Sequence, residues 1–142
     1  MGSVMTQITL WNRSDLELFH RGTLKEEEVP VEHLEALVDT GASTLVIPID
    51  VCRRLGLRKV RTVPVRLADG TDRDMDYMGA IYLRILDREM SLDALAAPEG
   101  TTPLIGQIPL EALDLVVDPR SRELRPNPAH PDGPLLYALR AA

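Results

Sequence analysis

A run of five residues, Asp-Thr-Gly-Ala-Ser at positions 39–43, contains the side chain best suited to chemistry. It follows the apolar segment 36–38 and precedes the apolar segment 45–47, a pattern typical of a turn at the end of a buried strand. Gly41 allows the backbone to turn sharply there. Because removing a carboxylate from water is costly, an Asp in this position indicates catalysis or a strong hydrogen-bond network.

A carboxylate can hydrolyse a peptide bond without metal or nucleophile when it shares a proton with a second carboxylate. The ionised group takes a proton from the attacking water, and the protonated group polarises the carbonyl oxygen. Two like charges at close range cannot both ionise cheaply, so one proton is retained. The Asp-Thr-Gly run occurs once in this chain, so Asp39 alone cannot form such a pair.

Other catalytic patterns are absent from the sequence. The three His residues are far apart, no His-Glu-x-x-His stretch occurs, and the single Cys has no partner, so we expect no metal site. No Gly-x-Ser-x-Gly, phosphate-loop or dinucleotide pattern occurs, so we expect no cofactor. A glycosidase also uses two carboxylates, but no other acidic residue stands in a strand-end position comparable to that of Asp39.

A second motif lies near the C-terminus, where Leu-Ile-Gly at 104–106 again places two apolar residues before a Gly. A helix-compatible stretch at 108–113 and a strand-like stretch at 115–117 follow it. Together with the Asp-Thr-Gly-Ala-Ser run, this arrangement resembles the retropepsin-like (clan AA) aspartic proteases, a family of retroviral and retrotransposon proteases and single-domain bacterial relatives. The resemblance extends from Val31 to Arg125. An unrelated small β protein with an Asp-Thr-Gly turn is the alternative.

The resemblance implies an all-β fold, a closed acid-protease barrel with one or two short helices, active as a homodimer. The two-fold axis would pass between two Asp39 residues and so complete the pair. Thr40 would hydrogen-bond across this axis, and the Gly41 amide would donate to the carboxylate. Ala42 stands where pepsin-type enzymes often carry a hydroxyl that lowers the pKa of the pair. Its lack of a donor predicts a pH optimum nearer neutrality.

Two departures from the retroviral pattern concern the dimer. Retroviral proteases brace the dimer with an Asp–Arg pair, whereas Ser43 and Gln107 occupy the matching positions here. Both charges are missing together, so a neutral hydrogen bond is one possible substitute. The dimer then needs other contacts, for which the N-terminal strand and the apolar segment 135–140 are candidates.

A long hairpin is expected from Val60 to Ile85, with arms at 63–67 and 80–85 and a strong turn signal at Asp69-Gly70. By resemblance this hairpin is the flap that closes over the substrate. A calcium loop would need a Gly where Tyr77 stands and a Glu where Leu83 stands, so we interpret its acidic stretch as a solvated, mobile flap. The expected substrate-binding residues are Ala42, Ser43, the flap-tip residues Ala68, Asp69, Gly70 and Thr71, and Ile105. Leu45, Val46, Ile47 and Leu67 are further candidates for pocket linings.

The remaining elements follow from simpler patterns. Strands are expected at 7–11, 16–19 and 91–95, and a charged, solvated bend at 25–28. Pro48 suits the first turn of a short helix that Gly56 would end. We expect one protease domain at 1–125, followed by a Pro-rich linker and an apolar C-terminal segment at 126–142.

Composition limits the function. A length of 142 residues suits one domain, and a net charge of -6 argues against nucleic-acid binding. Cys52 is alone, which excludes an intrachain disulfide, favours a reducing compartment and thus a cytoplasmic location, and is most consistent with a structural role. No stretch approaches the roughly 20 apolar residues that span a bilayer, and no signal peptide is evident, so we expect no membrane partner.

The predicted function is that of an aspartic endopeptidase that cleaves an extended polypeptide by water attack, with a homodimer as the active form. The predicted partners are therefore a polypeptide substrate and a second copy of the chain. One alternative is a retropepsin-fold dimer that has lost efficient cleavage and acts as a peptide-binding or assembly module. Another is a structural domain of a larger complex, which the apolar C-terminal segment would fit.

Overall fold

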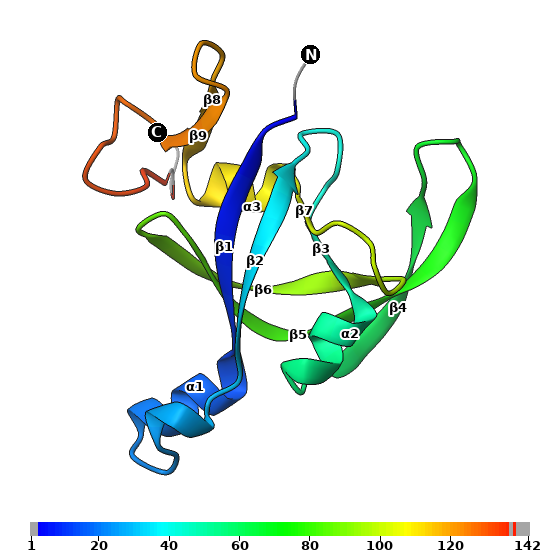
Figure 1. Cartoon of the computed structure of the whole chain (residues 1–142), viewed down its shortest axis with the longest axis vertical. Coiled ribbons are helices and arrows are strands. Elements are labelled where there is room, and N and C mark those ends of the chain that lie inside the picture. The colour runs from blue at the N-terminus through cyan, green and yellow to red at the C-terminus, as the bar shows by residue number, and fades with distance from the viewer. Residues whose placement is uncertain (1–2, 137, 139–142) are drawn as a thin grey trace.

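The computed structural model of this protein describes residues 3–136 and residue 138. Over these residues the protein is mostly β, with a few short helices (Figure 1). The strands are β1 (Met5–Asn12), β2 (Val31–Val38), β3 (Leu45–Pro48), β4 (Arg58–Arg66), β5 (Asp72–Ile85), β6 (Arg88–Ala97), β7 (Leu104–Ile105), β8 (Leu115–Asp118) and β9 (Glu123–Pro126). The helices are α1 (Arg13–His20), α2 (Ile49–Arg54) and α3 (Gln107–Ala112), with a 3-10 turn η1 (Glu26–Glu28).

Strands β1 to β7 form one sheet in the order β1-β2-β7-β3-β6-β5-β4. Strand β1 also pairs with β5. The paired strands β1, β2, β7, β3, β6 and β5 therefore form a closed circuit. Strand β4 stands outside this circuit as an arm of the β4–β5 hairpin. Strands β8 and β9 form a separate two-stranded hairpin beside the sheet, at the same end of the molecule as the N-terminus (Figure 1).

The predicted strand at 16–19 is wrong, because this segment lies inside helix α1. The Asn12 side chain accepts a hydrogen bond from the Asp15 backbone amide at 3.0 Å and so caps the first turn. Leu16 and Phe19 are then three residues apart on one helix face, where both are half-buried. The charged bend expected at 25–28 is the exposed turn η1.

The predicted hairpin has a different register. Val63 pairs with Met75 and Val65 with Arg73, so the arm at 63–67 does not pair with residues 80–85 as expected. Those later residues pair instead with β1 and β6. Strand β5 is long enough, at 14 residues, to belong to the β4–β5 hairpin in its first half and to the body of the sheet in its second.

The core lies between the strands and the helices α2 and α3. Several side chains that the sequence placed near the site are completely buried here, including Leu45 and Ile47. Cys52 is also buried, and burial raises the pKa of its thiol to about 11, which excludes a reactive thiolate at neutral pH. Helix α2 follows Pro48 and is ended by Gly56 at a φ of 68°, as predicted.

A buried cation ties the C-terminal part of the chain to the body. Arg88 is 3% exposed, and its Nη1 donates to the carbonyl oxygens of Leu113 at 3.0 Å and Asp114 at 2.9 Å. Its Nη2 donates to the carbonyl oxygen of His130. The Asp114 carboxylate also contacts His130 Nδ1 at 2.5 Å and accepts from the Asn127 side chain at 3.0 Å. Residues 127–130 are thereby fastened beside α3.

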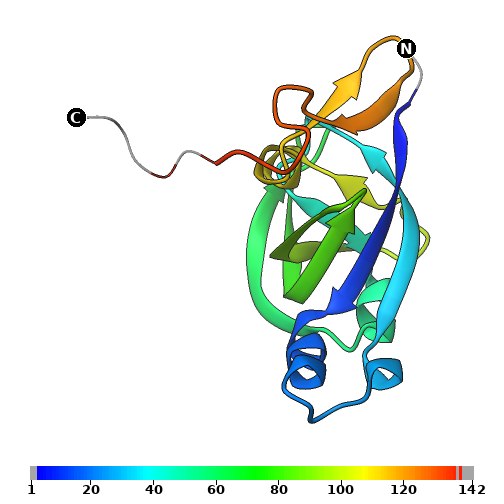
Figure 2. The ribbon, with the colours of Figure 1, turned by 90° about the vertical axis from the view of Figure 1, so that its left-hand side faces the viewer.

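The end of the chain is described only in part. Leu135 and Leu136 of the apolar segment are exposed, whereas its residues 137, 139 and 140 lie outside the described residues. Figure 2 shows the chain leaving the body beyond β9. In the described part of the chain, no helix combines the length and apolar character that crossing a bilayer requires.

Candidate active site

The loop that follows β2 holds Asp39 by its main chain. The Asp39 amide donates to the carbonyl oxygen of Ile105 at 2.9 Å, and the Asp39 carbonyl accepts from the Ala42 amide at 3.1 Å. The Gly41 amide donates to Asp39 Oδ1 at 2.9 Å, as the sequence predicted. The Asp39 side chain is half-buried, while Thr40 and Gly41 are exposed at the surface of the loop. The Asp39 carboxylate is therefore accessible to solvent, while its main chain is fixed by hydrogen bonds to Ile105 and Ala42.

The two sequence motifs meet at Gly106. Its amide donates to the Thr44 carbonyl at 2.9 Å, and the next two amides, of residues 107 and 108, donate to the carbonyls of Ala42 and Ser43 at 2.8 and 2.9 Å. A Cβ on Gly106 would lie 2.5 Å from both the amide nitrogen and the carbonyl oxygen of Thr44. Only Gly allows the two backbones to cross this closely, which is the physical reason for the second motif.

The tip of the β4–β5 hairpin is held mainly by its own residues. Asp69 Oδ1 accepts from the Thr71 backbone amide at 2.9 Å and from the Thr71 hydroxyl at 2.6 Å, and these bonds hold the pKa of Asp69 below its usual value. Gly70 takes a φ of 86°, as such a turn requires. Arg66 donates to both oxygens of Asp72, at 2.8 and 3.2 Å. In Figure 1 this tip and the loop after β2 lie at the same end of the molecule.

The comparison with protein families covers the region that contains both motifs. The model of the family described as "Aspartyl protease" matches residues 22–108, a range that contains Asp39, the β4–β5 hairpin and Gly106. The chain belongs to the aspartyl protease family. The retropepsin-like resemblance predicted from the two motifs is confirmed.

One solved structure reported as similar is the solution structure of Simian Foamy Virus (mac) protease, at 17% sequence identity and a TM-score of 0.45. The similarity covers 75% of this chain and 92% of that chain. No curated protein matches the sequence.

The residues expected to bind substrate in this aspartyl protease family member fall into two groups. Ala42 is half-buried, and Ser43 and the four flap-tip residues are exposed, so all are accessible to some degree. Ile105, by contrast, is 0% exposed. The Ile105 carbonyl accepts a hydrogen bond from the Asp39 amide and so positions Asp39. The Ile105 side chain has no exposed surface with which it could contact a substrate. Leu45 and Ile47 are likewise core residues, whereas Val46 and Leu67 remain partly exposed.

Ser43 and Gln107, the two positions that match the dimer brace, bond to other groups within the chain. The Gln107 side-chain amide donates to Glu111 Oε1 at 2.7 Å, within helix α3. Ser43 meets this helix through its main chain, by accepting from the Ile108 amide. The contact between loop and helix is thus made by backbone groups of one chain.

The acidic side chains of the hairpin are largely engaged with neighbours. Asp72 pairs with Arg66, which holds its pKa below the usual value, and Asp76 accepts from the Thr62 hydroxyl at 2.9 Å and lies 3.5 Å from Lys59 Nζ. Among the described residues, no three His, Cys, Asp or Glu side chains are grouped so that they could hold a metal ion.

Proposed function

We propose that this chain is an aspartic endopeptidase that acts as a homodimer, with Asp39 of each subunit forming the catalytic pair. The observation that carries this proposal is the placement of Asp39. Its carboxylate is half-exposed at the end of a strand, accepts from the Gly41 amide, and stands on backbone fixed by Ile105. Membership of the aspartyl protease family gives this arrangement a chemical role.

The chemistry requires a proton shared by two carboxylates. In the proposed dimer the ionised Asp39 accepts a proton from water as the water attacks the peptide carbonyl, and its protonated mate polarises the carbonyl oxygen. The Gly41 amide, by donating to Oδ1, orients the carboxylate. No covalent intermediate forms. The substrate lies extended between the flap tip and the loops, where strand-like walls offer main-chain hydrogen bonds.

Surface exposure beside the catalytic loop supports the proposed partner. Thr40 and Gly41 are exposed, and Ile108, whose amide bonds to Ser43, is 54% exposed despite its apolar side chain. A second copy placed across a two-fold axis near Thr40 would cover this surface. The two Thr40 hydroxyls would then hydrogen-bond and connect the two loops. Each subunit would keep its own sheet, as a closed barrel. Because the charged brace is missing, we expect weak association and concentration-dependent activity.

The test compares wild type with Asp39→Asn, which keeps the shape of the side chain and removes its charge. We expect wild type to cleave denatured casein and a peptide library, and Asp39→Asn to cleave neither above background. Asp132→Asn, which changes an exposed Asp in the C-terminal segment, is the matched control and should retain full activity. Equal cleavage by wild type and Asp39→Asn would overturn the proposal.

Two further measurements test the dimer and the effect of Ala42. The specific activity should rise with protein concentration over the range in which sedimentation detects association. The rate should peak nearer neutrality than in pepsins, because Ala42 gives no hydrogen bond that would lower the pKa of the pair. A strict monomer that retains full activity, or a rate maximum below about pH 3, would contradict these expectations.

The alternative is a peptide-binding or assembly module without efficient cleavage, which the uncharged positions 43 and 107 motivate. It predicts peptide binding that is equal in wild type and Asp39→Asn, with no cleavage by either.

The lone buried Cys52 fits a reducing compartment, so we place the enzyme in the cytoplasm.

A further inference from the structure

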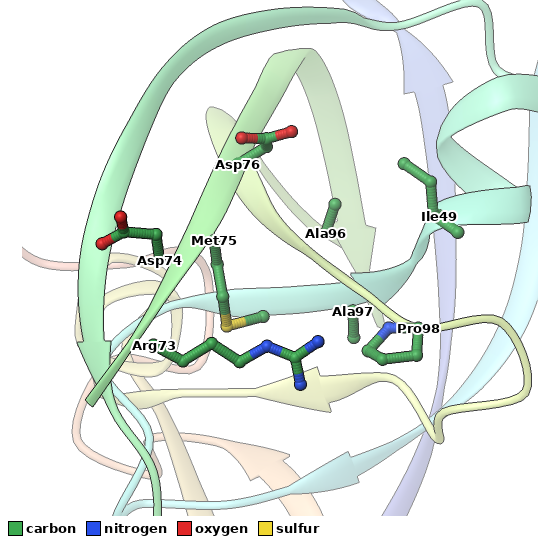
Figure 3. A pocket seen from close by; sticks show the side chains of 8 residues that line it. All are labelled: Ile49, Arg73, Asp74, Met75, Asp76, Ala96, Ala97 and Pro98. Carbon is green, nitrogen blue, oxygen red and sulfur yellow. The ribbon is translucent and has the colours of Figure 1, made fainter. Parts of the chain in front are cut away.

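A pocket of about 390 Å³ opens where β5 and β6 separate (Figure 3). The two strands pair as far as Tyr77 and Leu95, but β5 begins at Asp72 and β6 continues to Ala97. The residues beyond the last pair diverge and leave a wedge-shaped opening, here called the wedge pocket. Its lining consists of Ile49, Arg73, Asp74, Met75, Asp76, Ala96, Ala97 and Pro98.

The main chain of β5 is open toward this pocket. Residues 72–76 pair with β4 along one edge, and within the described residues no other strand pairs with their second edge. In a strand, alternate N–H and C=O groups point to each side, so this edge offers free donors and acceptors. Such an edge is where an extended peptide adds as a further strand.

The side chains give the pocket an apolar floor and the guanidinium of Arg73. Met75, Ala97 and Pro98 contribute the floor on the side of Arg73, whose guanidinium extends across the opening toward Pro98, whereas Ala96 points to the opposite side (Figure 3). Within the described part of the chain Arg73 forms no ion pair, in contrast to Arg66 beside it.

Two carboxylates, of Asp74 and Asp76, also line the pocket. The directions in which they point decide which charge lies over the apolar floor. Side chains alternate along a strand, so Asp74 and Asp76 leave β5 on the face opposite Arg73. In Figure 3 both carboxylates point away from the guanidinium. Asp76 is held from β4 by Thr62 and Lys59. The charge that reaches over the apolar floor is therefore positive.

We propose that the wedge pocket is a subsite for an extended stretch of the polypeptide substrate that carries an Asp or Glu side chain. The peptide main chain pairs with the open edge of β5, its aliphatic carbons cover the apolar floor, and its carboxylate meets Arg73. This inference rests on the proposed function, since it names a feature of that enzyme's substrates. Asp39 is not among the lining residues, so the acidic residue lies away from the bond that is cut.

The test uses short peptide libraries in which one position at a time is fixed as Glu, Gln or Lys. Cleavage by wild type is followed as kcat/KM, and binding to Asp39→Asn is followed by fluorescence anisotropy. At one position we expect Glu to be favoured over Gln by roughly two- to fivefold, the range of an exposed ion pair, with the preference weakened by salt. Arg73→Lys should keep the preference, Arg73→Gln should remove it, and Arg73→Glu should favour Lys.

The matched control is Arg120→Glu, which makes the same charge change in the turn between β8 and β9 and should leave the preference intact. Thermal unfolding of each variant checks that it is folded. Equal use of Glu and Gln by wild type at every position, or a preference unaltered in Arg73→Glu, would overturn the inference. If wild type cleaves no library but anisotropy retains the Arg73-dependent preference, the subsite stands and the proposed catalysis fails. If no peptide binds, the subsite is refuted.

Discussion

The loop after β2 and the tip of the β4–β5 hairpin are both turns beside strands, yet they are held in different ways. The loop after β2, whose residue Thr44 is nearly buried, is fixed by main-chain hydrogen bonds to the segment 105–108, which begins at the fully buried Ile105. The tip of the β4–β5 hairpin is held by hydrogen bonds among its own residues: main-chain bonds from the Leu67 amide to Thr71 and from the Gly70 amide to Leu67, and side-chain contacts of the exposed Asp69 and Arg66. Exposed ion pairs contribute little to stability, whereas buried main-chain groups that lose their partners are costly.

This difference matches what each region must do in the proposed enzyme. A catalytic carboxylate acts only when it is held in a narrow range of positions, and a main chain anchored in the core provides that constraint. A flap must open to admit a polypeptide and close over it. Contacts of low energy at its tip permit this motion.

The largest expected difference between the two regions comes from equivalent glycine substitutions. Gly106→Ala places a Cβ 2.5 Å from the Thr44 backbone, so it should destabilise the protein by at least about 3 kcal/mol or prevent folding. Gly70→Ala meets no atom within 4 Å and suffers only from a φ of 86°, so its cost should be about 1 kcal/mol. Denaturant unfolding of both variants measures the contrast.

Gly133→Ala serves as the control for these two substitutions, because no atom lies within 4 Å of its Cβ position. It should unfold with wild-type stability. Similar losses for Gly106→Ala and Gly70→Ala would remove the distinction between an anchored loop and a loosely held tip.

Acid should weaken the flap and the C-terminal anchor. Thr71 lowers the pKa of Asp69, Arg66 lowers that of Asp72, and a hydrogen bond from Asn127 is the main cause that lowers that of Asp114. A carboxyl whose pKa is lower in the folded chain stabilises the fold fully above its unfolded pKa of about 4, and this contribution is lost as the pH falls through the folded pKa. The unfolding temperature should therefore be constant from neutral pH to about pH 5 and fall below about pH 4.

The matching variant is Asp72→Asn, which should flatten part of the acid-side fall in unfolding temperature. A curve of wild-type shape in this variant would mean that the Arg66–Asp72 pair does not contribute to the flap's stability. Such a result would leave the other carboxyls whose pKa is lowered, such as Asp69, Asp114 and Asp118, to account for the fall.

A smaller effect is expected for the flap ion pair at neutral pH. Arg66→Gln should change the free energy of unfolding only slightly, because both partners are exposed, and salt should reduce the difference further. A double-mutant cycle with Asp72→Asn isolates the pair from other effects. A strong coupling would mark a hairpin tip that is more rigid than its exposure indicates.

The smallest expected effect concerns Cys52. Its thiol is buried and has a pKa of about 11, so a thiol reagent at pH 8 should leave the folded protein unmodified and its activity unchanged. The reagent should label the protein after denaturation, which mass spectrometry can follow. Rapid labelling of the folded protein would show that helix α2 opens readily.

The sequence predicted the parts of the fold that depend on local chemistry. The turn at Asp39 and helix α2 between Pro48 and Gly56 are examples, because a Gly or Pro at a fixed place restricts the backbone whatever lies around it. The importance of Gly106 was visible as a pattern, but the crossing with Thr44 that requires it depends on a contact between distant segments.

The failed predictions depended on contacts beyond the local pattern. Helix α1 was mistaken for a strand because its apolar residues are few and its cap, Asn12, belongs to the preceding strand. The hairpin register was wrong because alternation looks the same along all of β5, although its halves have different partners. The wedge pocket arises where two strands diverge, which periodicity alone does not reveal.

The anchoring of Arg88 has a practical consequence for where this protein can be cut. A chain truncated at Pro126, close to the predicted domain boundary, would retain the buried guanidinium of Arg88 but lose the His130 carbonyl that accepts a hydrogen bond from it. An interior charge deprived of an acceptor favours opening of the surrounding structure. The stretch from Asn127 to His130 is thus needed to satisfy the buried Arg88. Shortened versions of the protein for crystallisation or enzymology should therefore end beyond His130.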